Sequence, residues 1–228
     1  MNTQINQESQ SQDSFSPFAS IRISEYRNLM LGRFLFIMGL RMMGTLVGWW
    51  IYNLTNDPLA IGLVGLSEVI PAVSFALYAG HVIDLSEKRK LMLRGITLYF
   101  LCAIILLLLS THFTSNHLGN HWIAVCVYAV IFCTGVTRAF TGPVFTVLVA
   151  LIVPKNLLQN ATTWNQGVWL SASVTGHALG GLFISFIGIT GTLVIICSLI
   201  FLSFFAMFRL KPKPPLNEPG EKKTWESV

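Results

Sequence analysis

The chain has 228 residues, of which 53% are hydrophobic and 11% are charged, with a formal net charge of +5. Soluble domains carry about a quarter charged residues, so this chain has too little polar surface to dissolve in water. The composition therefore predicts an all-α membrane protein, because helices satisfy their own backbone hydrogen bonds in lipid. The positive charge lies at the ends of apolar stretches and does not indicate a nucleic-acid partner.

The two ends of the chain are predicted to be soluble tails. Residues 1–19 are rich in Asn, Gln and Ser and lack the basic start and apolar core of a signal peptide, so we expect a disordered cytoplasmic tail. Residues 20–210 form the membrane domain. Residues 211–228 are charged and rich in Pro, which predicts a cytoplasmic linker or tail.

Long apolar stretches between charged or helix-breaking residues predict six membrane-spanning helices. The last two share an uncharged stretch, 156–208, and are separated by a predicted turn at Ile187–Gly191. The predicted spans are roughly Leu29–Tyr52, Leu59–Ile83, Leu93–Thr111, Trp122–Phe145, Thr163–Phe186 and Thr192–Arg209.

The basic residues predict the orientation of these spans. Of the 15 Lys and Arg residues, three lie within spans, at Arg33, Arg41 and Arg138, and the others all lie on the side that holds both termini. Basic residues near membrane spans accumulate on the cytoplasmic face. We therefore expect a multi-pass protein of the cytoplasmic (inner) membrane with both termini in the cytoplasm.

The loop after the second predicted span holds the densest cluster of charge. It resembles the signature of the major facilitator superfamily, which Gly80, Asp84, Lys88 and Arg89 match, while Leu and Glu stand where the family has an Arg and a second Gly. We expect Gly80 to let a partner helix approach closely. The carboxylate of Asp84, unfavourable at a helix C-terminus, needs compensation from Lys88 or from the N-terminus of another helix.

The fifth predicted span carries four glycines. Gly167, Gly176, Gly180 and Gly181 resemble the motif Gly-x8-Gly-Pro-x-x-Gly-Gly of drug antiporters and related exporters, with His177 in place of Pro. Glycines lower helix propensity, and tight helix packing is the compensation that we expect. An ordinary packing face of small residues is the alternative.

Two further stretches resemble the same family. Residues 138–142, RAFTG, are similar to its Arg-x-x-Gln-Gly motif in the fourth span, and the overall order is similar to siderophore and macrolide exporters. The resemblance covers about residues 20–215. It implies the N-terminal six-helix half of a transporter, built of 3+3 inverted repeats.

Charged residues inside the spans are expensive in lipid and are expected to face inward. Arg41 and Glu68 lie at similar depths, so we expect them to pair in a central cavity and to contact a substrate or a coupling proton; a purely structural pair is the alternative. Arg138 lies in the inner half of its span. Arg33, near the inner end, is expected to extend to the membrane surface. His177 is a candidate proton carrier or a packing residue.

These features predict a secondary transporter that exports a small organic solute by alternating access, driven by an ion gradient. Two deep arginines, Arg41 and Arg138, favour an anionic or zwitterionic substrate. The expected partners are the bilayer, the substrate, a proton, and a second six-helix half or a homodimer partner. No cofactor, metal or enzymatic activity is expected. The alternative is a truncated, transport-inactive protein with a binding or assembly role.

Overall fold

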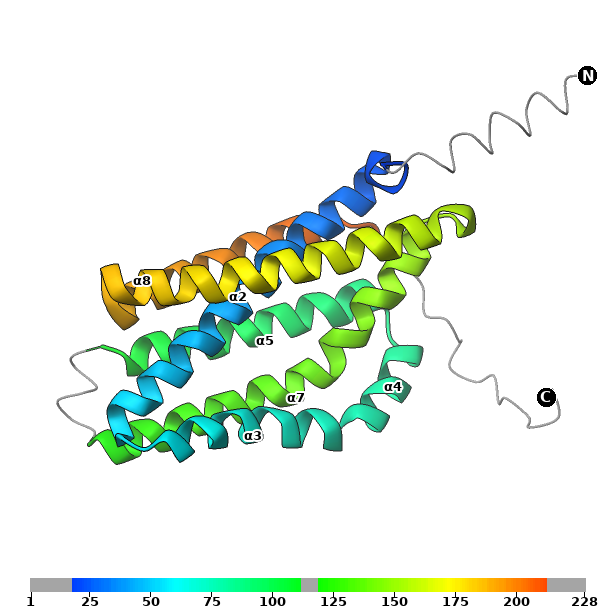
Figure 1. Cartoon of the computed structure of the whole chain (residues 1–228). Coiled ribbons are helices and arrows are strands. Elements are labelled where there is room, and N and C mark those ends of the chain that lie inside the picture. Colours follow the sequence, from blue (N-terminus) through cyan, green and yellow to red (C-terminus); the bar gives the residue numbers. More distant parts are fainter. Residues whose placement is uncertain (1–17, 112–118, 213–228) are drawn as a thin grey trace, which may run out of the picture.

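The computed structural model describes residues 18–111 and 119–212, and every regular element in these ranges is helical (Figure 1). The predicted tails, 1–19 and 211–228, lie almost wholly outside the described residues. In chain order the elements are η1 (Ser20–Arg22), α2 (Ser24–Thr55), α3 (Pro58–Ser74), α4 (Ala76–Leu85), α5 (Lys88–Leu109), α7 (Asn120–Ile152), η2 (Lys155–Leu157) and α8 (Leu158–Phe208).

Several of these helices are long and apolar enough to cross a bilayer. They are α2, α5, α7 and the segment Lys155–Phe208 that contains α8, and the bent pair α3–α4 adds a fifth if it forms one span. The helical architecture agrees with the expected membrane protein. The count of six crossings in two inverted repeats stays a prediction.

A single glycine divides α8 into two arms. Gly188 has φ 70° and ψ −174°, which is not helical, and the chain reverses direction there (Figure 1). A positive φ suits glycine because it has no Cβ. The second arm starts with Thr192 donating to the carbonyl oxygen of Gly188 at 2.7 Å. This break lies inside the turn predicted at 187–191.

The predicted second span, Leu59–Ile83, is not one straight helix. It is interrupted at Phe75, and α3 and α4 are bent by 52°. Pro71 lies one turn before the break, and its ring removes a backbone donor and displaces the preceding carbonyl, which bends or breaks a helix. The bend carries α4 away from the axis of α3.

The helices form two groups, one of α2 and α8 and the other of α3, α5 and α7. The most extensive contact is between α2 and α8. Helix α7 packs on α3 and α5, and α5 also contacts α8. Buried hydrogen bonds tie the first pair together: Ser203 donates to the carbonyl of Gly32 at 2.8 Å, and Tyr26 donates to the carbonyl of Ala161 at 2.6 Å. Helices α3 and α8 have no extensive contact with each other, and a cavity lies between them.

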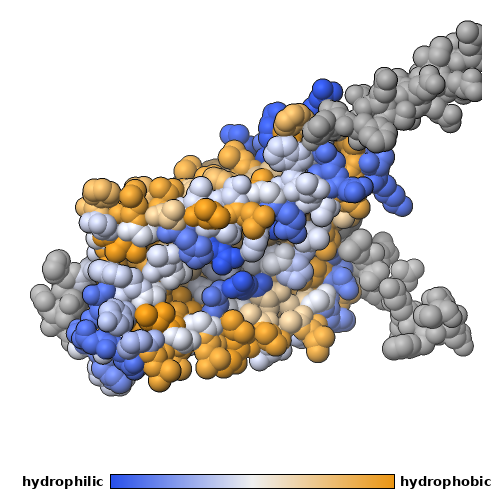
Figure 2. Space-filling model, viewed as in Figure 1, coloured by the Kyte–Doolittle hydropathy of each residue, from blue (hydrophilic) through white to orange (hydrophobic). Residues whose placement is uncertain are grey.

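The helix surfaces that face the viewer in Figure 2 carry large apolar areas. Among the described residues, the most exposed large apolar side chain is Leu77 of α4, at 92%. Hydrophilic residues instead gather in a hollow between α8 and α3 (Figure 2). An apolar exterior with a polar interior is the arrangement that a lipid solvent favours.

Candidate functional site

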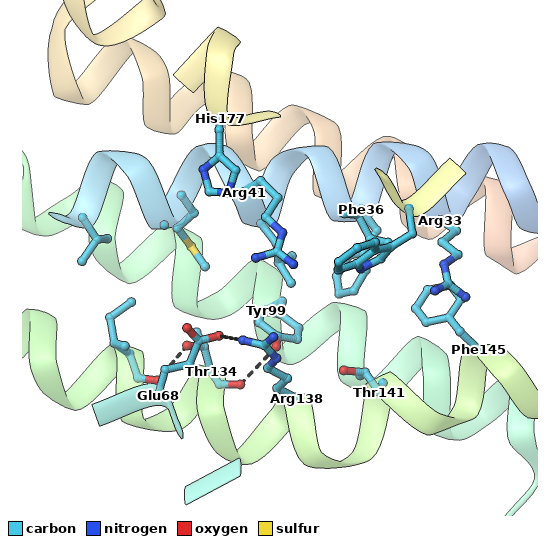
Figure 3. Close-up of a pocket in the computed structure, with 18 of the residues that line it drawn as sticks. Arg33, Phe36, Arg41, Glu68, Tyr99, Thr134, Arg138, Thr141, Phe145 and His177 are labelled. Carbon is cyan, nitrogen blue, oxygen red and sulfur yellow. Dashed lines mark hydrogen bonds and ion pairs between the residues drawn. The ribbon is translucent and has the colours of Figure 1, made fainter. Parts of the chain in front are cut away.

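The hollow is a cavity of about 180 Å³ that lies between α2, α3, α7 and α8, with one residue from α5. By the same measure a single water needs about 10–15 Å³, so the cavity has room for a small solute. The four residues that the sequence suggested for a substrate or ion pathway all line it: Arg41, Glu68, Arg138 and His177 (Figure 3). The charged and polar lining residues are Arg33, Arg41, Glu68, Tyr99, Thr134, Arg138, Thr141 and His177.

An ion pair joins α3 and α7 across this cavity. Arg138 Nη1 lies 2.7 Å from Glu68 Oε1, and the two side chains are 47% and 34% exposed. The expected pair between Arg41 and Glu68 is therefore wrong. The physical reason is rotation about the helix axes: depth along a span does not say which helix faces which, and α3 packs on α7 more than on α2.

A glycine on α7 sets the distance between the paired helices. Gly135 lies one turn before Arg138, and a Cβ at Gly135 would collide with the backbone carbonyl of Glu68 and with the ring of Pro71. Only glycine lets α7 approach α3 this closely. Gly135 was not singled out from the sequence, although it lies only three residues before a deep arginine.

Arg41 belongs to the cavity wall but not to the ion pair. Its guanidinium lies over the ring of Trp169, with 5.5 Å from Cζ to the ring centroid. Within residues 18–111 and 119–212 its guanidinium donates no hydrogen bond. A cation held by a ring face keeps its donors available for an anionic ligand. Trp169 was also not singled out from the sequence.

His177 lies next to Arg41 in the cavity (Figure 3). Its Nδ1 is 2.9 Å from Thr45 Oγ1, and the same hydroxyl donates to the carbonyl of Arg41 at 3.2 Å. The imidazole is exposed to the cavity, so it is not a packing residue enclosed in the core.

Aromatic rings form the inner part of the wall. The ring of Phe36 packs edge-on against Tyr99 at 5.2 Å and stacks on Phe145 at 5.9 Å. The Tyr99 hydroxyl donates to the carbonyl of Thr134 at 3.1 Å. Arg33 lies over the ring of Phe145, 5.0 Å from its centroid (Figure 3).

Arg33 does not extend to the membrane surface as expected. Its side chain is buried, with 8% exposed. It points from α2 toward Phe145 of α7 and not along the helix toward the cytoplasm (Figure 3). The expectation used position along the span alone, and the direction of a side chain depends on the neighbouring helix.

The glycine motif of the fifth predicted span has two parts with different surroundings. A Cβ at Gly176 would lie 2.7 Å from Met38 O, and one at Gly180 would lie 3.1 Å from Met42 Cα, so both glycines allow α8 to pack closely on α2. A Cβ added at Gly167 or Gly181 would meet no atom of a neighbouring element within 4 Å among the described residues. Two of the four glycines of the motif, Gly176 and Gly180, therefore pack α8 against α2, the helix that carries Arg41.

Basic residues at the junction of α4 and α5 cap the C-termini of two helices, α4 and α8. Lys88 is fully buried, and its Nζ donates to the carbonyls of Ile83, Asp84 and Ser86, the last two at 3.1 Å. We expected Lys88 or the N-terminus of another helix to compensate the carboxylate of Asp84. The hydrogen bonds of Lys88 go to the unpaired carbonyls at the end of α4, which carry the negative end of the helix dipole. The charges of Lys88 and Asp84 also attract each other.

Arg89 caps the second arm of α8. Its Nη2 donates to the carbonyl of Phe208 at 2.6 Å, and its guanidinium lies 5.1 Å from the centroid of the Phe208 ring. A Cβ added at Gly80, in contrast, would meet no atom within 4 Å in the part of the chain that the structure describes. The close approach of a partner helix at Gly80 stays a prediction.

The chemistry available in the cavity is binding by charge and hydrogen bonds. Three arginines face one carboxylate, and that carboxylate already pairs with Arg138. In the described ranges no group of three or more His, Cys, Asp or Glu could hold a metal ion. The cavity therefore carries excess positive charge, which attracts anions.

Comparison with known proteins supports the resemblance at the level of the superfamily. No curated protein matches this sequence. The sequence model of the family described as "Major Facilitator Superfamily" matches residues 29–228, which covers all the helices from α2 onward except the first residues of α2. Members of this family are membrane transporters. The chain belongs to the major facilitator superfamily.

Proposed function

We propose that the chain is the N-terminal six-helix half of a secondary transporter that exports a small organic solute bearing negative charge. Transport occurs by alternating access across the cytoplasmic membrane and is driven by an ion gradient. The observation that carries the substrate class is Arg41: its guanidinium lies in the cavity over Trp169, while Arg138 already neutralises the only lining carboxylate.

Six crossings follow if the two irregular helices are interpreted as spans. The bent pair α3–α4 counts as one crossing, and the two arms of α8 count as two. Together with α2, α5 and α7 this makes an even number, so both termini lie on the same side. The Lys and Arg distribution assigns that side to the cytoplasm. Inverted repeats would comprise α2, α3–α4 and α5 in one repeat, and α7 and the two arms of α8 in the other.

Glu68 is the group that we assign to ion coupling. It is the only acidic residue among those that line the cavity, and it pairs with Arg138 through a single contact at 2.7 Å. An acidic residue that faces a cavity inside the membrane is the usual carrier of a coupling proton in transporters. His177, exposed in the same cavity, is a further proton carrier.

Alternating access requires a second six-helix body, either another chain or a second copy of this one. The faces of α3 and α4 support such a partner. Leu59, Val73 and Leu77 are exposed there, and Cβ atoms at Gly65 and Gly80 would meet no described atom within 4 Å. A partner helix could therefore approach the backbone at both glycines.

Transport currents in proteoliposomes test this proposal. The chain is reconstituted alone and with a candidate second half, and its response to a panel of small organic acids is compared with the response to their amine counterparts. We expect currents for acids, reduced about tenfold or more by Arg41→Gln, because a charge-assisted hydrogen bond contributes roughly 1.5–3 kcal/mol. The exposed Arg94→Gln is the matched control. Currents for amines alone would contradict the anionic substrate.

A further inference from the structure

Arg33 is a buried cation whose hydrogen-bonding groups are not used. Its Nε and Nη1 are both inaccessible to solvent and have no hydrogen-bond acceptor in the described part of the chain. The side chain is 8% exposed, and the contact that holds it is the face of the Phe145 ring. A ring face attracts a cation but accepts N–H groups poorly, so the cost of burying this guanidinium is not fully compensated.

The cavity beside Arg33 contains no carboxylate that could pair with it. Among the lining residues, all of which are described, Glu68 is the only acid, and Glu68 pairs with Arg138. In the wall, Arg33 lies over the ring of Phe145, on which the ring of Phe36 stacks. A buried charge left without a partner is usually explained by function. Arg33 lines the cavity, so an anion that enters there would place a negative charge beside the guanidinium.

We infer that Arg33 forms a second anion subsite, at the inner end of the cavity, for the carboxylate of an organic acid with an apolar body. The guanidinium supplies the charged donors, and the stacked rings of Phe36 and Phe145 supply the surface for the apolar part. Arg33 precedes Arg41 by eight residues on α2, which corresponds to about 12 Å along the helix axis. This subsite rests on the proposed transport function and adds a second position for the substrate along the cavity.

Binding of benzoate to the purified full chain in phosphatidylcholine nanodiscs tests the subsite without requiring transport. The binding constant and the thermal unfolding midpoint are measured for the wild type, for Arg33→Met and for Arg27→Met. Arg27 is the matched control because it is an exposed arginine on the same helix. Benzylamine, which has the opposite charge on the same ring, tests whether the site selects an anion.

Two effects of opposite direction are expected for Arg33→Met. Without benzoate its unfolding midpoint rises, because an unpaired buried charge is replaced by an apolar side chain of similar length. Its benzoate affinity falls roughly tenfold or more, because a charge-assisted hydrogen bond is lost. Arg33→Lys, which keeps the charge but not the planar fork, retains part of the affinity. A structural arginine would produce a lower midpoint and unchanged affinity.

Three results would overturn the subsite. Equal benzoate affinity in the wild type, Arg27→Met and Arg33→Met would place the anion elsewhere and leave the proposed transport function intact. Absence of benzoate binding to all variants would remove the organic acid as the ligand. Stabilisation that depends on Arg33 only when phosphatidylglycerol is added to the nanodiscs would identify a lipid headgroup as the occupant.

Discussion

At the scale of single residues, the cavity shows which charge is paired with which. Arg41, Arg138 and Glu68 lie around one space, yet the short contact is between Glu68 and Arg138. The distinction matters because a paired arginine is neutralised, whereas an arginine held only by a ring remains free to bind an anion. The assignment of Arg41 to substrate and of Glu68 to coupling depends on this difference.

A double-mutant cycle measures this pairing directly. We expect Glu68→Gln and Arg138→Gln to be coupled by about 0.5–1 kcal/mol in the free energy of unfolding, a value reduced by solvent screening of a partly exposed pair. The matched cycle of Glu68→Gln with Arg41→Gln should give a smaller coupling. Unfolding by denaturant in detergent provides the measurement. A coupling to Arg41 as large as that to Arg138 would contradict the pairing in the structure.

At the scale of elements, glycines decide how close the helices lie. Gly176 and Gly180 bring α8 against α2, and Gly135 brings α7 against α3. In each contact, one of the two helices carries a charged residue of the cavity: α2 carries Arg41, and α3 carries Glu68. Close packing therefore positions the charged side chains as well as the backbones.

A pair of alanine substitutions in α8 separates packing from propensity. Gly176→Ala would place a Cβ 2.7 Å from the carbonyl oxygen of Met38, so we expect it to destabilise the protein by about 1–3 kcal/mol. Gly181→Ala meets no described atom within 4 Å and should stabilise it by up to about 1 kcal/mol through helix propensity. Thermal unfolding in detergent compares them. Equal effects from both substitutions would show that α8 does not contact α2 at Gly176.

At the scale of the whole molecule, the basic loop links helices that are far apart in sequence. Lys88 closes the end of α4, and Arg89 closes the end of the second arm of α8. On the proposed topology, the charges that are predicted to orient the spans also cap helix ends on the cytoplasmic side. Orientation and helix capping would then depend on the same few residues.

Thiol labelling tests this orientation. After the native cysteines are replaced by Ala, Thr55→Cys at the end of α2 should react with an impermeant maleimide in intact cells. Lys90→Cys, at the start of α5, should react only in inverted membrane vesicles, because basic segments remain in the cytoplasm. Both positions are exposed in the structure. Reaction of Lys90→Cys in intact cells would reverse the proposed topology. The native cysteines are Cys102, Cys126, Cys133 and Cys197.

Much of the architecture could be predicted from local signals. The turn at Gly188 and the capped turn at Asn56 and Asp57 follow from residues that favour positive φ or accept helix N–H groups. The bend at Phe75 was missed although Pro71 was visible. The reason is that a proline in a membrane helix is often tolerated when neighbouring groups satisfy the freed carbonyl.

The sequence by itself determined that the protein lies in a membrane, that it is helical and to which family it belongs. These properties depend on composition, on the distribution of Lys and Arg and on motif spacing. Each of these can be recognised without knowing how one helix faces another. Only the tertiary structure decided that Glu68 pairs with Arg138 and that Arg33 is buried against Phe145. These contacts depend on the rotation, bend and separation of neighbouring helices, which are set by packing between residues distant in the chain.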